Sequence, residues 1–306
     1  MRRSGFCPRR AAEPTGINLT RHLGPLAMAA GTAAFIVNDA CVKLLSATLA
    51  AEHAIFLRGV IATSIIAVVA ALGGHLRPAY LTDLANPPVL IRTVGDVAST
   101  FLIYLALSRL QLADVTAITM SGPLLTVALA VMVHRERVSG ARRLAILVGF
   151  VGVLLIVKPG SSSFDPYMLA ALSIAALQAI REVATQSIPR RLPSILVTLV
   201  TAGSVTAVSG VWSGFSGLPP LTAREAFLIV TAGLAISAGY HLLVLAVRVA
   251  PLPTVAPFRY SAVLWSIPMG AAVFGNFPDA LSLLGAAVVV ASGLYIVRPA
   301  RGSIGA

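Results

Sequence analysis

The sequence predicts an all-α membrane protein in which ten transmembrane helices form two inverted five-helix repeats. Ten apolar stretches, most of them close to the roughly 20 residues that carry a helix across a bilayer, follow one another between residues 25 and 297. Hydrophobic residues make up 57% of the 306 residues and charged residues only 11%, a balance that no water-soluble core of this size requires. The second half of the chain also repeats features of the first at a constant offset.

The apolar stretches are predicted to be helices because they lack the sustained apolar–polar alternation that the strands of a membrane β-barrel need. In chain order, the expected spans are 25–47, 54–73, 89–108, 112–133, 142–158, 166–188, 194–216, 223–247, 253–274 and 281–297. Helix-breaking Gly and Pro residues separate many of them, as at Gly73, Pro87, Pro159, Pro219 and Pro278. We expect residues 1–24 to form a disordered cytoplasmic tail.

The net charge of +12 reflects membrane topology rather than nucleic-acid binding. Sixteen arginines fall in segments on the side of the two termini, whereas the opposite side receives only Arg109, Lys158 and Arg224. The positive-inside rule therefore places both termini in the cytoplasm of a multi-pass protein of the cytoplasmic (inner) membrane. Anionic lipid headgroups on the cytoplasmic side are the expected partners of these arginines. Whether the protein also forms a homodimer is left open by the sequence.

The two predicted repeats cover residues 25–160 and 161–300. Residues 155–159, which end in Lys-Pro, match residues 295–299, which end in Arg-Pro, at an offset of 140 residues. Each repeat holds five spans, and because five is odd, the two halves must cross the membrane in opposite orientations. Inverted repeats of this kind are typical of secondary transporters, whose halves rock about a site near the midplane.

Two stretches carry a resemblance to a known family. Residues 123–137, followed by the Gly-rich run 149–153, resemble the end of an EamA repeat, with a membrane proline, a turn and a glycine-rich fifth helix. Residues 256–278 look like the second copy, although Asn276 stands where that family commonly has Glu. The resemblance to the EamA family of the drug/metabolite transporter superfamily implies a ten-helix carrier. Relatives with this layout include amino-acid exporters, S-adenosylmethionine carriers and riboflavin importers.

Ionisable groups inside the predicted spans are the candidates for function, because each costs about 2.5 kcal/mol or more unless it is paired, hydrated or used. They are Asp39, Lys43, Arg58, Asp96, Arg181, Glu182, His241 and Arg259. Asp39 and Lys43, four residues apart, form either a local ion pair or part of a site. Arg58 is expected to face Asp39 or a solvated cavity. Arg181 and Glu182 point about 100° apart on a helix and should not pair with each other.

Arg259 follows Pro257, and a proline favours a broken helix beside a cavity; the alternative for Arg259 and Arg181 is that both extend to the headgroups. Trp265 lies near the middle of its span, away from the interfacial belt where Trp usually lies. We expect a central cavity with these substrate-binding residues: Asn38, Asp39, Arg58, Asp96, Tyr104, Arg259, Tyr260 and Trp265. The candidates for coupling to an ion gradient are Asp39, Asp96 and Glu182. The fifth and tenth spans should pack apart from this cavity.

These residues predict a secondary transporter that moves a small organic metabolite by alternating access. The candidate substrates are a riboflavin-like planar metabolite, an amino acid or its derivative, and S-adenosylmethionine, with protons as a candidate coupling ion. No phosphate-binding loop is present, and no cofactor or metal is expected. The alternative is an intramembrane enzyme of the hydrolase or lipid-transferase type, but the sequence lacks the HExxH and GxSxG motifs. A channel is disfavoured because alternating access explains inverted repeats better.

Overall fold

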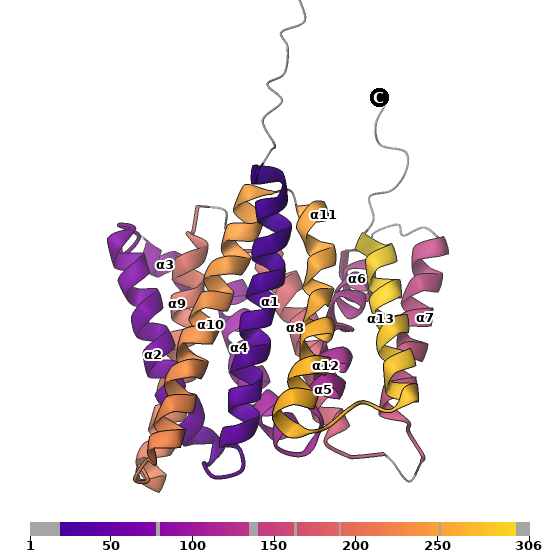
Figure 1. Cartoon of the computed structure of the whole chain (residues 1–306). Helices are drawn as coiled ribbons and strands as arrows, with labels where there is room; N and C mark the ends of the chain where they lie inside the picture. Colours follow the sequence, from indigo (N-terminus) through magenta and orange to yellow (C-terminus); the bar gives the residue numbers. More distant parts are fainter. Residues whose placement is uncertain are drawn as a thin grey trace, which may run out of the picture.

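The computed structural model describes residues 19–77, 80–134, 140–161, 164–189, 191–250 and 252–297, and every regular element in these ranges is a helix. The long helices stand side by side and cross a similar thickness, and both described ends of the chain lie at the same end of the bundle (Figure 1). We call this the terminal end and the other the far end. The all-α fold predicted from the sequence is confirmed.

The described residues of the first half form six long or medium helices and one short one. They are α1 (Leu19–Leu45), α2 (Ala51–Leu72), α3 (Leu81–Leu84), α4 (Pro87–Arg109), α5 (Leu112–Thr119), α6 (Gly122–His134) and α7 (Gly140–Val157). The predicted fourth span is therefore two helices rather than one. The break falls just before Pro123, because a proline has no amide hydrogen for the preceding turn and its ring clashes with the carbonyl four residues earlier.

The second half has a similar series of helices. They are α8 (Met168–Gln186), α9 (Ser194–Ser216), α10 (Ala223–Val249), α11 (Leu252–Val255), the 3₁₀ helix η2 (Ala256–Tyr260), α12 (Ser261–Phe274) and α13 (Ala280–Val297). The helix break predicted around Pro257 is present as η2. Helices α6 and α12 both follow such a break, and α7 and α13 begin at residues 140 and 280. The two-repeat interpretation stays a prediction, which these matching offsets support.

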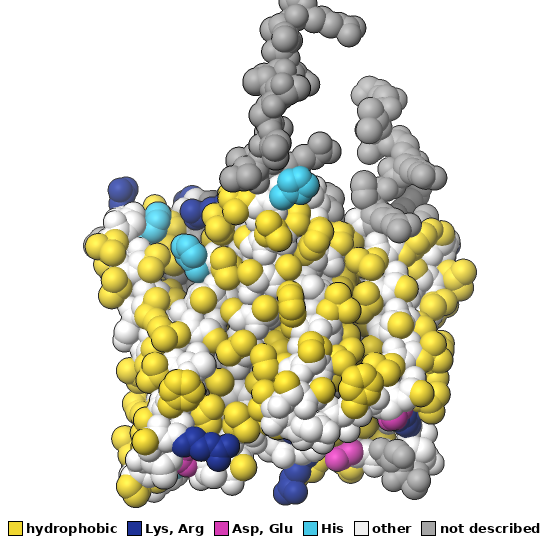
Figure 2. Space-filling model, viewed as in Figure 1, with side chains coloured by type: hydrophobic (Ala, Val, Ile, Leu, Met, Phe, Trp, Pro, Cys, Tyr) yellow, Lys and Arg dark blue, Asp and Glu magenta, His cyan; other side chains and the backbone are white. Residues whose placement is uncertain are grey.

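The helices have the length and composition of membrane spans. Eight helical segments in the described ranges are long and apolar enough to cross a bilayer, and a shorter apolar helix covers Arg143–Val157. Hydrophobic side chains cover the middle of the surface in Figure 2, whereas the Lys, Arg, Asp and Glu side chains visible there lie towards the two ends. A surface of this kind is that of a multi-pass membrane protein, since apolar side chains cost nothing against lipid.

The helices pack in pairs, and one apolar pair of helices, α7 and α13, lies at the edge of the bundle. Helix α1 packs mainly along α10, α8 along α4, and α2 along α9. Helices α7 and α13 pack on each other at the edge of the bundle (Figure 1). Their backbones approach closely where Gly152 meets Gly285, because a Cβ built on Gly285 would lie 2.5 Å from the Gly152 carbonyl oxygen. Small residues allow this approach between membrane helices.

The start of α13 is fixed by Asp279. Its Oδ1 accepts hydrogen bonds from the backbone amides of Leu281 and Ser282, each at 3.0 Å. Lys158, just after α7, donates a hydrogen bond to the same carboxylate, and this contact holds the pKa of Asp279 below its usual value. The far ends of α7 and α13 are thus joined by an ion pair as well as by packing.

Candidate functional site

Three predicted residues meet between α1 and α2, and we call Asn38, Asp39 and Arg58 the Arg58 cluster. Arg58 Nη1 donates a hydrogen bond to Asn38 Oδ1 at 2.8 Å, and Asn38 Nδ2 donates to Asp39 Oδ1 at 2.8 Å. Arg58 is 7% exposed and also interacts electrostatically with Asp39. The amide of Asn38 therefore relays between a buried cation and a carboxylate, so that neither charge is left unpaired in the apolar interior.

Lys43 does not take part in this cluster. Its Nζ donates to the carbonyl oxygens of Leu107 at 2.8 Å and Leu110 at 2.6 Å, and no Asp39–Lys43 ion pair occurs among the described residues. The local ion pair considered from the sequence is therefore wrong. The last carbonyls of a helix have no partner within it, and a lysine from another helix satisfies them.

A second group of charges lies between α4, α8 and η2, and we call Arg92, Asp96, Arg181, Glu182 and Arg259 the Arg181 cluster. Arg181 Nη1 donates to Asp96 Oδ1, and Arg92 Nε lies 3.8 Å from Asp96 Oδ2. Arg259 Nη1 donates to Glu182 Oε1 at 2.9 Å. Adjacent residues of α8 thus bind partners on two different elements, and the arginines pair inside the bundle instead of extending to the headgroups.

Tyr240 of α10 lies between the two clusters. It interacts electrostatically with Arg58 of the first cluster and with Asp96, Arg181 and Arg92 of the second. Its ring packs edge-on against Phe35 of α1, with centroids 5.2 Å apart. Tyr240 is therefore within electrostatic range of both clusters, which lie near each other in the bundle.

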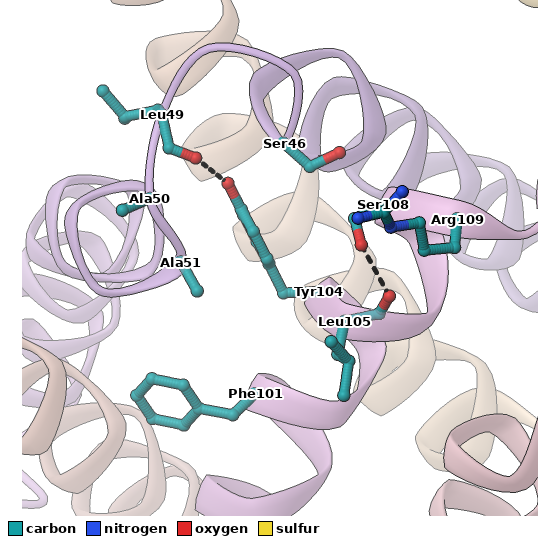
Figure 3. Close-up of a pocket in the computed structure, with 9 residues that line it drawn as sticks. All are labelled: Ser46, Leu49, Ala50, Ala51, Phe101, Tyr104, Leu105, Ser108 and Arg109. Carbon is teal, nitrogen blue, oxygen red and sulfur yellow. Dashed lines mark hydrogen bonds between the residues drawn. The ribbon is translucent and has the colours of Figure 1, made fainter. Parts of the chain in front are cut away.

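Of the three predicted aromatic residues, Tyr260 lies within electrostatic range of Arg259 and Glu182 in the Arg181 cluster, whereas the hydrogen bonds of Tyr104 and Trp265 go to backbone carbonyls elsewhere. Tyr104 lines a cavity of about 610 Å³ at the far end and donates a hydrogen bond to the Leu49 carbonyl (Figure 3). Tyr260 is 3% exposed, and its hydroxyl lies against Gly293 of α13. Trp265 is 43% exposed, and its Nε1 donates to the Ala29 carbonyl at 3.0 Å.

Sequence reasoning missed Arg92, which it counted with the cytoplasmic arginines. The structure places Arg92 within α4, where its Nη1 donates to Thr185 Oγ1 of α8 at 2.7 Å. It also missed Thr126 of α6, whose hydroxyl donates to Glu182 Oε2 at 3.1 Å. The spacing of Arg92 and Asp96, four residues apart on one helix face, was the signal that could have found the first.

Comparisons with known proteins agree with this arrangement. Residues 22–158 match the model of the EamA-like transporter family. The chain is 27% identical over 271 residues to the pseudopaline exporter CntI of Pseudomonas aeruginosa, a match that covers 88% of this chain and 93% of the exporter. It is 31% identical over 198 residues to an S-adenosylmethionine uptake transporter of Rickettsia bellii, covering 62% of this chain and 65% of that protein.

A riboflavin transporter of Brucella anthropi is 26% identical over 206 residues, which cover 65% of this chain and 72% of that transporter. One solved crystal structure matches with a TM-score of 0.61 over 89% of this chain and 98% of its own length, at 18% identity, and so shows the same fold. The protein is thus a small-molecule transporter, and the intramembrane enzyme considered from the sequence finds no support. The family model and these relatives support the drug/metabolite transporter superfamily.

Proposed function

We propose that the protein carries a small organic metabolite through the polar region between the Arg58 and Arg181 clusters by alternating access. The observation that supports this is seven charged side chains in the interior of a bundle with an apolar surface. They are Arg58, Arg92, Arg181, Arg259, Asp39, Asp96 and Glu182. Hydrophobic residues of similar volume would fill the same space at no cost in stability, so retained charges in a membrane interior indicate a pathway.

Two observations support the substrate class: the compounds in the names of the related transporters, and the charged groups of the site. Pseudopaline, S-adenosylmethionine and riboflavin are polar organic metabolites, and the two clusters offer both guanidinium and carboxylate groups. We propose a metabolite of this kind, with Asn38, Asp39 and Arg58 binding one part of it and Asp96 and Arg259 another. Tyr104, Tyr260 and Trp265 stay predicted contacts of the substrate, and Tyr260 lies within electrostatic range of Arg259 and Glu182.

Asp39 is the proposed coupling residue if transport uses a proton gradient. Asp96 and Glu182 each have an arginine as a direct ion-pair partner. Among the described residues, no cationic nitrogen lies within 4.0 Å of a carboxylate oxygen of Asp39. Its hydrogen bond comes from the neutral amide of Asn38. A carboxylate without a direct cation is easier to protonate in an apolar interior than one with a cation beside it.

We further propose that the terminal end faces the cytoplasm across the inner membrane. Among the described residues, Arg77 after α2, Arg191 before α9 and Arg248 near the end of α10 lie at that end, and the far end carries Arg109, Lys158 and Arg224. The arginine-rich tail adds to the basic side, as the positive-inside rule requires.

The test is uptake by reconstituted vesicles of radiolabelled riboflavin, S-adenosylmethionine, nucleosides and aromatic amino acids, with and without an imposed pH gradient. We expect saturable uptake of at least one compound, and a loss of about 100-fold in Arg58→Ala and Arg259→Ala. The exposed Arg77→Ala serves as the control. If both site variants transport normally while well folded, the charged-site model fails. A pH gradient that drives wild-type uptake but not uptake by Asp39→Asn would support proton coupling.

A further inference from the structure

The Arg181 cluster holds one more cation than it holds carboxylates. Arg92, Arg181 and Arg259 stand against Asp96 and Glu182. Glu182 and Arg259 pair with each other, so the excess charge lies where two arginines share the single carboxylate of Asp96. The Arg58 cluster, by contrast, has one cation and one carboxylate, which compensate each other.

Two hydrogen-bond donors at this shared carboxylate have no partner. Arg92 Nε and Arg181 Nε are both buried and make no hydrogen bond, although each arginine uses another nitrogen on Thr185 or Asp96. A buried donor left unpaired is destabilising, and more so when it is charged. The structure therefore shows a place where an added acceptor with a negative charge would be favourable.

The two Nε atoms are themselves buried, but the side chains around them are partly open. The side chains of Arg92 and Arg181 are 19% and 22% exposed, and that of Asp96 is 12% exposed. The neighbouring Glu182 and Arg259 side chains are 28% and 35% exposed. The cluster is therefore partly exposed where side chains of α4, α8 and η2 meet through their ion pairs.

We propose that Arg92 and Arg181 form the binding site for a carboxylate group of the transported metabolite. This inference rests on the proposed transport function and adds the substrate class: a metabolite with an acidic group. A carboxylate has two oxygens in a plane and matches the planar donors of guanidinium groups. It would accept from the guanidinium groups of Arg92 and Arg181, reaching their buried Nε atoms as it displaces the Asp96 carboxylate, and would neutralise the excess charge. Any cationic or hydroxyl part of the metabolite would face the Arg58 cluster.

Asp96 is then a competitor of the substrate for the two guanidinium groups. It gives the sharpest prediction, because its neutral variant should bind a carboxylate more tightly, whereas a variant that merely damages the fold should bind it more weakly. Arg92→Lys keeps the charge but removes the Nε donor, so it separates the effect of charge from that of hydrogen-bond geometry.

The experiment uses benzoate as the probe and the isosteric, uncharged benzamide as its control. The purified protein, in a Cys7→Ser background, is heated with a thiol-reactive dye that reports unfolding when the buried Cys41 becomes exposed. We expect benzoate, but neither benzamide nor chloride at equal ionic strength, to raise the unfolding midpoint. The half-saturating benzoate concentration should fall about tenfold in Asp96→Asn, rise about tenfold in Arg92→Lys, and stay unchanged in Arg77→Gln.

Equal effects of benzoate and benzamide, or weaker benzoate binding in Asp96→Asn with wild-type stability, would overturn the carboxylate site. This readout does not depend on transport. Failure of the proposed function would appear instead as an absence of uptake in the vesicle screen, so the two failures are distinguishable.

Discussion

Removal of the Arg58 guanidinium should expose how strongly the interior depends on paired charges. Arg58 is 7% exposed, and its Nη1 donates a hydrogen bond to Asn38 Oδ1 at 2.8 Å. It is also the cation that interacts electrostatically with Asp39. In Arg58→Met the volume of the side chain is largely kept, but the Asp39 carboxylate and the Asn38 amide oxygen lose their cationic partner. The expected loss comes from the charge left behind rather than from a cavity.

The magnitude follows from leaving the Asp39 charge uncompensated: removing one partner of a buried charge pair, here linked through Asn38, typically costs about 3–5 kcal/mol. For a chain of this size, 1 kcal/mol lowers the Tm by roughly 2 °C, so Arg58→Met should lose roughly 6–10 °C. Adding Asp39→Asn removes the uncompensated charge. The double variant should therefore recover about 2 kcal/mol, which lies within the usual range of coupling between contacting residues and corresponds to roughly 4 °C.

The assay is thermal unfolding in detergent of the wild type, both single variants and the double variant, so that the double-mutant cycle isolates the pairwise coupling. Arg77→Met, at an exposed position outside the helices, controls for the loss of an arginine in general. If Arg58→Met and the double variant melt at the same temperature, Asp39 and Arg58 do not interact and the reasoning is refuted.

Three further predictions concern packing, the aromatic contact and topology. Gly285→Val should lower the stability by about 1–3 kcal/mol, because its side chain meets the Gly152 backbone, and equal stability in unfolding assays would contradict the close approach of α7 and α13. Substrate binding should quench Trp fluorescence, and Trp265→Phe should abolish most of the change; quenching left intact would remove Trp265 from the site. In a cysteine-free background, an impermeant thiol reagent outside the cell should label Asn276→Cys but not Ser187→Cys, and the reverse pattern would overturn the orientation.

The helices could be predicted from the sequence because a lipid bilayer restricts which backbone conformations are stable. A run of apolar residues must form a helix there to satisfy its own backbone, and Gly and Pro end it, so α9 has the predicted limits of 194 and 216. Helix α1 begins at Leu19, earlier than predicted, because helical hydrogen bonding continues through polar residues outside the bilayer. The break before Pro123 was missed because the apolar pattern runs through it without interruption.

The charge pairs could not be predicted, because they depend on which helices meet. Glu182 pairs with Arg259, 77 residues away, and nothing in the local sequence of either residue names the other. Local spacing even misled: Lys43 lies one turn from Asp39, yet the unpaired carbonyls at the end of α4 are the partners it binds. Local rules identify which residues need a partner, and only the tertiary arrangement, which brings α1 onto α4 and Glu182 of α8 to Arg259 of η2, supplies it.

The position of α8 explains how an apolar bundle holds so many charges. Arg181 and Glu182 leave α8 in directions about 100° apart, so one binds α4 and the other binds η2 and α6. The cost of burying each of these two adjacent charges is thereby offset by a different neighbour. A change in the angle between these elements must break or exchange a pair, and a substrate carboxylate at Arg92 and Arg181 would supply the charge that Asp96 then withdraws. Substrate binding and helix movement would in this way be linked through the same three guanidinium groups.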